Sequence, residues 1–148
     1  MLWWRVQRSH AQVAIPQGKR VAFRGASLTQ TSGAFTTIER ATSSSGRRLS
    51  SGPASFRLFD VADGAELHFS RVRLREGDAQ TECGGAIRVR GTGTLVMQYS
   101  ELSGNTATNG GAICLAGPGT LQLLAVTMHS NAVSGAGPNL FLARPLSS

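Results

Sequence analysis

Alternating arginines are the chemical feature that stands out in this chain. The stretch RVRLR places Arg71, Arg73 and Arg75 at every second position, and IRVR does the same for Arg88 and Arg90. A guanidinium group fixed on a rigid strand can hold a carboxylate, sulfate or phosphate through paired hydrogen bonds. These five arginines are therefore the candidate binding residues. The alternative is ordinary decoration of an outward strand face.

Carboxylates that could catalyse hydrolysis or elimination are scarce. The chain has eight acids, at Glu39, Asp60, Asp63, Glu66, Glu76, Asp78, Glu82 and Glu101. A glycoside hydrolase needs a converging pair of carboxylates, and a Ca²⁺-dependent lyase needs several around one ion. Asp60, Asp63 and Glu66 are close in sequence, but they flank a strand end and a turn, where solvated acids are common. The sequence therefore assigns no catalytic residue.

Histidines and cysteines do not show the spacing of a metal site. His10 lies near the N-terminus, and His68 and His129 are expected to point outward, so no metal and no cofactor is predicted. Cys83 and Cys114 fall five columns apart in the repeat described below. At about 3.3 Å per strand residue, that separation exceeds disulfide reach unless a bend folds the two together. Free thiols are the prediction.

The net charge of +7 comes almost entirely from arginine, because Lys19 is the only lysine. Strong basicity suits an acidic polymer or nucleic acid as partner. The arginines are scattered, however, without a basic helix or an aromatic-interleaved patch. The partners that this pattern allows are a carbohydrate or another acidic polymer, or a protein surface. Nucleic acid is less favoured.

An internal repeat organises the chain. Three landmarks recur 26 residues apart: GGAI at 84 and 110, GTL at 93 and 119, and asparagine at 105 and 131. Between them apolar residues alternate with polar ones, which indicates strands, and glycine, asparagine, proline and threonine gather at turns. Each unit therefore holds about three short strands. Stacking such units predicts an all-β parallel β-helix, in which each rung buries its inward side chains against the next.

Weaker copies extend the repeat in both directions. RLFDV at 57–61 resembles GAIRV at 85–89 with an offset of 28, and GPNLFLA at 137–143 reads as one more first strand. We predict about four short rungs over 13–143, with a Ser/Gly-rich loop at about 40–55. Residues 1–12 are expected to form an irregular N-terminal cap or segment that includes Trp3 and Trp4. Residues 144–148 form a tail.

The rung model predicts which outward residues stack. Asp60, Arg88 and Cys114 should share one column on the first strand of the rung, and Arg73, Glu101 and Thr127 one on the third. Both columns then contain a cross-rung ion pair. Each pair is expected to be exposed and to contribute only about 0–1 kcal/mol.

The GGAI words, each followed by an apolar-x-x-Asn element, resemble the GGAI and FxxN repeats of polymorphic outer-membrane proteins and related autotransporter-like adhesins. The second motif stands here as LSGN at 102–105 and MHSN at 128–131, with Leu and Met where that family has Phe. The resemblance covers about residues 57–143. It implies a right-handed β-helix of the pectate-lyase-like class and an extracellular or cell-surface location.

The repeated letters have a structural interpretation of their own. A glycine pair lets the backbone turn tightly into the strand, the isoleucine enters the core, and the asparagine bonds neighbouring backbone groups at a bend. The motif residues are Gly84, Gly85, Ile87, Asn105, Gly110, Gly111, Ile113 and Asn131.

The sequence therefore favours a non-catalytic structural or binding segment, adhesin-like and part of a longer solenoid. If the chain is instead catalytic, a fragment of a polysaccharide lyase or glycoside hydrolase is the alternative. No apolar run approaches the ~20 residues of a membrane span. MLWW lacks the apolar region of a secretory signal peptide, because Arg5 and Arg8 follow it.

Overall fold

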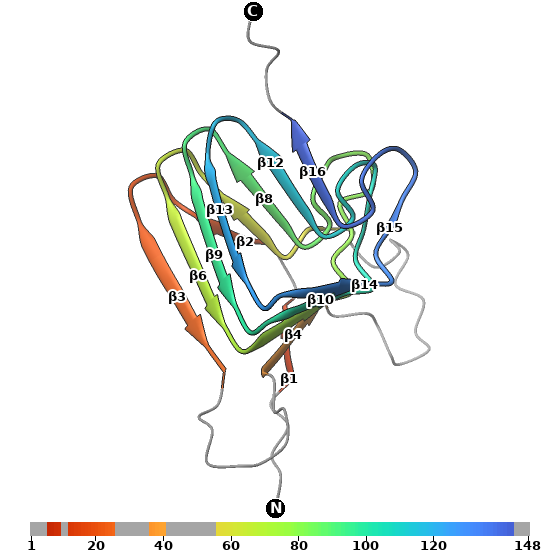
Figure 1. Ribbon diagram of the computed structural model, residues 1–148, viewed down its shortest axis with the longest axis horizontal. Helices are drawn as coiled ribbons and strands as arrows, with labels where there is room; N and C mark the ends of the chain where they lie inside the picture. Colours follow the sequence, from red (N-terminus) through yellow and green to blue (C-terminus); the bar gives the residue numbers. More distant parts are fainter. Residues whose placement is uncertain (1–5, 10–11, 26–35, 41–55, 144–148) are drawn as a thin grey trace, which may run out of the picture.

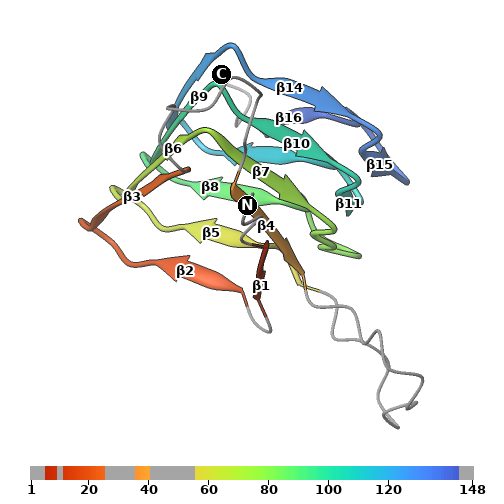
Figure 2. The same ribbon diagram turned by 90° about the horizontal axis from the view of Figure 1, so that it is seen from below.

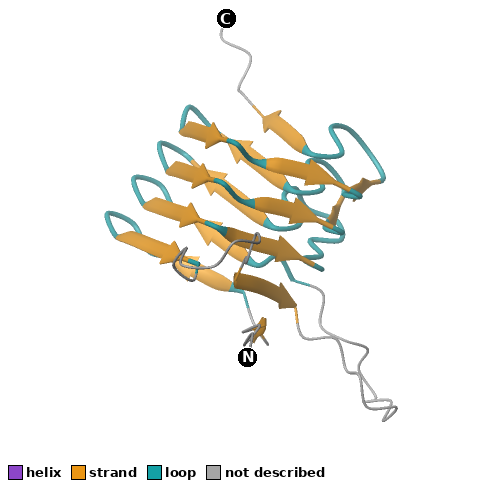
Figure 3. Cartoon of the chain, turned by 60° about the horizontal axis from the view of Figure 1, so that its bottom comes forward, coloured by secondary structure: helices purple, strands orange, loops and turns teal. Residues whose placement is uncertain are grey.

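The computed structural model describes residues 6–9, 12–25, 36–40 and 56–143. All regular structure in these residues is β-strand, and the strands wind into a stacked solenoid (Figure 1). Successive passes of the chain lie one above another as parallel layers (Figures 2 and 3). The predicted parallel β-helix is therefore confirmed.

Three long sheets and one short sheet form the walls of the solenoid. The first sheet contains β2 (Val13–Ile15), β5 (Phe59–Val61), β8 (Ile87–Arg90), β12 (Ile113–Ala116) and β16 (Leu140–Ala143). The second contains β3 (Arg20–Arg24), β6 (Glu66–Ser70), β9 (Thr94–Gln98) and β13 (Thr120–Leu124). The third contains β1 (Val6–Ser9), β4 (Thr36–Arg40), β7 (Val72–Arg75), β10 (Glu101–Ser103) and β14 (Thr127–His129), and the short sheet pairs β11 (Thr106–Ala107) with β15 (Ala132–Val133).

The strand register follows the sequence repeat. Ile87 pairs with Ile113, and Leu95 with Leu121, at the offset of 26. Phe59 pairs with Ile87 at the offset of 28, and β16 continues the first sheet beside β12. The weaker copies in RLFDV and GPNLFLA are therefore rungs of the same solenoid, as predicted.

The core lies between the three sheets and consists of the inward residues of each strand. Ile87, Leu95, Met97, Leu102 and Ile113 are all fully buried. Alternate residues point outward, and burial alternates along β6, β7 and β9. Each inward side chain packs against its equivalents in the rungs above and below, so the repeat stabilises the fold through stacked apolar columns.

Asparagines close one corner of the solenoid in a ladder. The Asn105 side chain is fully buried; its Oδ1 accepts from the Gly77 N–H at 3.0 Å, and its Nδ2 donates to the Leu74 carbonyl at 3.2 Å. Asn131 repeats this arrangement one rung on, with Oδ1 accepting from the backbone and side chain of Asn105, both at 3.0 Å. The two asparagines thus satisfy backbone groups that a bend would leave unpaired.

A second corner joins the second sheet to the third through a column of left-handed residues. Arg71, Tyr99 and Ala125 have φ of 57°, 49° and 51°, in three successive rungs. In the rung below, Gly25 takes the equivalent place, next to Arg24, which pairs with Ser70. This corner positions the site described in the next subsection.

The prediction of free thiols on the outer face is wrong. The Cys83 and Cys114 sulfurs form a disulfide, with the two Cα atoms 5.5 Å apart. The column count failed because Cys83 lies before β8 and not on it. The chain turns at Gly84, with φ of 74°, and Cys83, which bridges Asn109 of the next rung, lies within disulfide reach of Cys114. For the same reason Cys114, although outward, is fully buried.

The N-terminal segment also differs from its prediction. Residues Val6–Ser9 are not irregular but form β1, which pairs in parallel with β4. The open edge of β4 offers unpaired backbone donors and acceptors, which favour this added strand. Trp3, Trp4 and His10, the loop residues 41–55 and the tail 144–148 lie outside the described residues.

Candidate functional site

The five predicted binding arginines do not form one patch. Arg73 and Arg75 lie on β7 in the third sheet, and Arg71 lies at the corner just before it. Arg88 and Arg90 lie on β8 in the first sheet. Of these five, four are paired with carboxylates, and the exception is Arg71.

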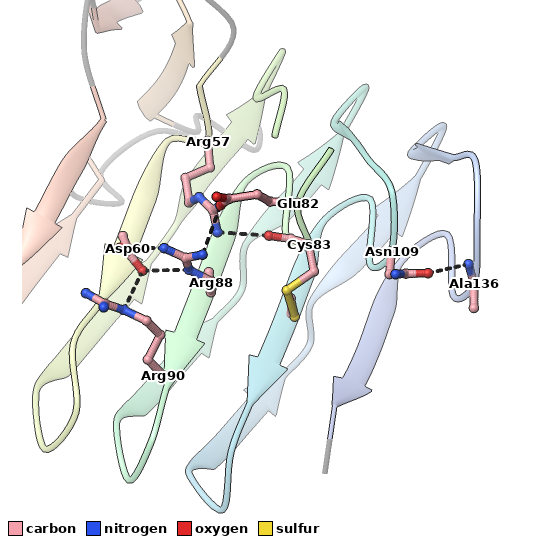
Figure 4. Close-up of a disulfide and its surroundings, with 9 residues drawn as sticks. Arg57, Asp60, Glu82, Cys83, Arg88, Arg90, Asn109 and Ala136 are labelled. Atoms are coloured by element: carbon pink, nitrogen blue, oxygen red, sulfur yellow. Dashed lines mark hydrogen bonds and ion pairs between the residues drawn. A yellow bond between two sulfur atoms is a disulfide. The ribbon is translucent and has the colours of Figure 1, made fainter. Parts of the chain in front are cut away.

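On the first sheet, the arginines belong to a dense ionic cluster made by Arg57, Asp60, Glu82, Arg88 and Arg90 (Figure 4). Arg88 grips Asp60 with two hydrogen bonds of 3.1 Å and reaches Glu82 at 2.9 Å. Arg90 approaches the same Asp60 at 3.2 Å. Arg57 pairs with Glu82 and also donates to the Cys83 carbonyl at 2.9 Å. This ionic cluster therefore ties β5, β8 and the turn before the glycine pair into one unit.

The centre of the ionic cluster is buried and its outer members Glu82 and Arg90 are half-exposed, which corrects the expectation that the Asp60–Arg88 pair is exposed. Asp60 is 5% exposed and Arg57 is 3% exposed. Burial raises the pKa of Asp60, but the hydrogen bonds and charges of the surrounding arginines outweigh it and leave the pKa below its ordinary value. Burial, and the nearby Arg88 charge, lower the pKa of Arg57 to about 10. Both groups are thus ionised near neutral pH and act as charged partners.

On the third sheet, the arginines are paired across rungs. Arg73 contacts Glu101 at 3.0 Å, as the register predicted, and Arg75 contacts Glu39 at 3.0 Å. Burial raises the pKa of Glu101, but the hydrogen bond and charge of Arg73 outweigh it, so the pKa is lowered. The glutamates neutralise the charges of Arg73 and Arg75, which would otherwise attract an anion to this face.

Two further acids, Asp63 and Glu66, also serve the scaffold. Asp63 accepts from the Thr92 N–H at 2.7 Å and from its hydroxyl at 2.8 Å, and these bonds lower the pKa of Asp63. The Arg20 hydrogen bond, and then that of His68, lower the pKa of Glu66. Within the described residues, no group of three or more His, Cys, Asp or Glu is arranged to hold a metal ion.

A groove of about 620 Å³ opens at the corner between the second and third sheets. Outward residues of three consecutive rungs line it: Ala22, Arg24, His68, Ser70, Val96 and Gln98, together with Phe23, Gly25, Phe69 and Arg71. Arg24 and Arg71 both line this corner groove, and none of the described residues that line it is an aspartate or glutamate. Its chemistry is that of a receptor for an anionic or hydroxyl-rich group.

The backbone builds the corner groove through a close approach of two rungs. The Gly25 N–H donates to the Ser70 carbonyl at 2.7 Å, and the Arg71 N–H donates to the Gln98 carbonyl at 3.0 Å. A Cβ on Gly25 would lie 2.0 Å from the Arg71 carbonyl oxygen. Glycine is therefore required here, and it brings Arg24 close to Arg71.

Sequence reasoning identified Arg71 but missed Arg24. Arg24 stands alone in VAFRGAS, without the alternation that drew attention to RVRLR. The available signal was the register, since aligning Val21 with Leu67 places Arg24 beside Ser70 and hence next to Arg71.

No protein-family model, curated protein or solved structure matches this chain. The described residues contain no helix whose length and apolar character would let it cross a membrane.

Proposed function

We propose that this chain is a non-catalytic structural and binding segment of a surface protein, similar to adhesin repeats. The observation that carries this proposal is the division of charge on the outer face. The carboxylates hold neighbouring rungs together, whereas the corner groove offers cationic and neutral hydrogen-bonding groups. A receptor for an acidic or hydroxylated ligand needs these groups, and a hydrolase or lyase needs converging carboxylates.

The acid that would be the first choice for catalysis is already committed to the scaffold. Both oxygens of Asp60 are held by Arg88, and Arg90 contacts one of them. A general acid needs a pKa raised toward neutrality, and the pKa of Asp60 is shifted the other way. This geometry favours binding over polysaccharide cleavage.

The disulfide supports a location outside the cytosol. Structural disulfides persist in secreted and cell-surface proteins and are rare in reducing compartments. The Cys83–Cys114 bond joins two rungs and is shielded on the Cys114 side, as a structural disulfide would be. Together with the GGAI and apolar-x-x-Asn words, it supports kinship with the outer-membrane and autotransporter-like repeats.

The test is a direct comparison of binding with cleavage. The purified chain should be incubated with a carboxylated polymer (polygalacturonate), a sulfated one (heparin) and a neutral one (dextran). We expect retarded migration in affinity electrophoresis with an acidic polymer and no change in polymer length. Shortening of any polymer, or new unsaturated or reducing ends, would refute the non-catalytic role. Absence of binding to all three polymers would refute the proposal of a carbohydrate-binding segment.

A further inference from the structure

We propose that the corner groove is a binding site for an acidic saccharide, in which Arg24 and Arg71 grip a carboxylate or sulfate group. This inference rests on the proposed binding function and assigns it a site and a ligand class. It also replaces the five-arginine patch as the place where recognition occurs.

The first argument is the pairing of the arginines. Among arginines whose side chains are described, Arg20, Arg57, Arg73, Arg75, Arg88 and Arg90 each contact a carboxylate. The other two arginines whose side chains are described, Arg24 and Arg71, contact no carboxylate, and both line the corner groove. Two uncompensated guanidinium groups at one concave place attract an anion more strongly than the neutralised faces do. Each can bind a carboxylate or sulfate with two hydrogen bonds.

The second argument is the chemistry of the other residues that line the corner groove. Ser70, His68 and Gln98, whose side chains carry hydroxyl, imidazole and amide groups, line the same groove, and His68 Nε2 also lies 3.3 Å from Glu66 Oε2. Such side chains both donate and accept, as sugar hydroxyls do. Ala22 and Val96 add an apolar surface on which a ring can rest. The volume of about 620 Å³ also lies in the usual range for small-ligand sites.

The third argument separates a saccharide from a nucleic acid. A nucleic acid is bound through a row of phosphate contacts along its backbone. In the described part of the chain, the arginines beyond the corner groove are paired, so they do not continue a cationic track away from Arg24 and Arg71. One local pair of arginines, flanked by hydrogen-bonding side chains, suits a polymer whose acid groups are separated by hydroxyl groups.

The corner itself is rigid enough to preorganise the site. Arg71 is held in the left-handed region with φ of 57°, and its carbonyl accepts from the Thr36 N–H at 3.2 Å. Its own N–H is bonded to the next rung, and Gly25 is bonded to Ser70. The Arg71 side chain therefore projects from backbone that is bonded on both sides, and that of Arg24 from a strand bonded to β6, which reduces the entropy lost on binding.

The experiment measures the affinity of the whole chain for a heparin-derived sulfated oligosaccharide and for oligogalacturonate, by calorimetry. Single-stranded DNA and a neutral dextran oligosaccharide serve as the other arms. The test variant is Arg24→Gln with Arg71→Gln. The matched control is Arg73→Gln with Arg75→Gln, which removes the same charge from arginines that the structure shows paired. Circular dichroism and thermal unfolding verify that both variants fold.

We expect the test variant to bind the preferred acidic saccharide on the order of 10- to 100-fold more weakly, and the control to lose less than about threefold. Arg24→Lys with Arg71→Lys should retain intermediate affinity, because charge remains but the paired geometry is lost. The arm that binds more tightly tells whether the acid group is a sulfate or a carboxylate.

Three outcomes would overturn the assignment. Binding that is equal in the test variant and the wild type would show that the groove is not the site, although the binding function would stand. A larger loss in the control would assign recognition to the third sheet. DNA bound more tightly than either saccharide, and lost in the test variant, would make the groove a phosphate site. If the wild type binds no saccharide, the proposed function itself fails.

Discussion

The first sheet and the corner groove both carry arginines on the outside of the solenoid, but their surroundings differ. On the first sheet, Arg57 and Arg88 are surrounded by Asp60, Glu82 and the disulfide, and Arg57 is almost completely buried. At the corner, Arg24 and Arg71 line a groove whose other described lining residues include no carboxylate. The difference teaches that alternation of arginine along a strand indicates an outward position only. The residue stacked above or below decides whether the charge is used for folding or left for a ligand.

Changes on the first sheet should therefore reduce stability without reducing binding, and changes to the groove arginines should do the reverse. The following predictions test this contrast, from the largest expected effect to the smallest.

Acidification should have the largest effect, because it acts on several scaffold carboxylates together. Asp60, Asp63, Glu66 and Glu101 all have a lowered pKa in the folded chain. A lowered folded-state pKa gives stability that is complete above the unfolded value, about 4, and is lost as the pH falls through the folded value. The melting temperature should thus hold near neutrality and fall below about pH 4. A flat profile down to about pH 2.5 would mean that these contacts contribute little.

Reduction of the disulfide should have the next largest effect. The bond closes a sequence separation of 31 residues, and the loss of a closure of this length destabilises a chain by about 3–4 kcal/mol. Chemical denaturation with and without reductant measures the change. Saccharide affinity at low denaturant should not change, because the groove lies on other sheets. Reduction with no loss of stability would show that the ionic cluster alone holds the turn.

Replacement of the central acid of the ionic cluster should follow in size. Asp60→Asn removes the buried carboxylate between Arg57, Arg88 and Arg90 and leaves Arg57 and Arg88 only the half-exposed Glu82 as a charge partner, which we expect to cost about 2–3 kcal/mol. Asp63→Asn is the matched control, since Asp63 is exposed and its loss should cost clearly less than that of Asp60. Equal costs for the two variants would show that the ionic cluster is no more than a surface pair.

Gly25→Ala should damage the corner rather than the core. The added Cβ would meet the Arg71 carbonyl at 2.0 Å, so the two rungs must separate locally, at a cost of about 1–3 kcal/mol. Saccharide affinity should fall although both guanidinium groups remain. Gly18→Ala is the control, because nothing lies near a Cβ at that position and the substitution strains only its own backbone, whose φ is 69°. Retention of wild-type affinity by Gly25→Ala would argue against a preformed groove.

The smallest effect on stability is expected for the groove arginines themselves. Arg24→Gln and Arg71→Gln remove no ion pair seen in the described residues, so each should change the free energy of unfolding by less than about 0.5 kcal/mol. Thermal unfolding of the single variants measures this. A loss above about 1 kcal/mol for either would mean that its arginine supports the fold.

Most of the fold could be predicted from the sequence because a solenoid repeats its constraints. The pairing of Ile87 with Ile113 and the ladder from Asn105 to Asn131 follow directly from letters 26 residues apart. The disulfide and the burial of Asp60 could not be predicted in this way. They depend on how the turn before Gly84 folds over the outer face, and alternation along a strand carries no information about that turn.

The candidate site was only partly visible in the sequence for a similar reason. Arg71 belongs to an alternating run, but its role depends on lacking the acid that Arg73 and Arg75 each have. Arg24 comes from a rung whose copy of the repeat is weak. Only the backbone approach of Gly25 to Ser70 brings the two arginines to one groove.

The most direct test of the contrast is an amide NMR titration of the wild-type chain with the sulfated or carboxylated oligosaccharide. The account predicts shift changes at the amides of Gly25, Ser70, Arg71 and Gln98, and little change at those of Arg88 and Arg90. Changes centred on Arg88 and Arg90, with the corner unaffected, would contradict it.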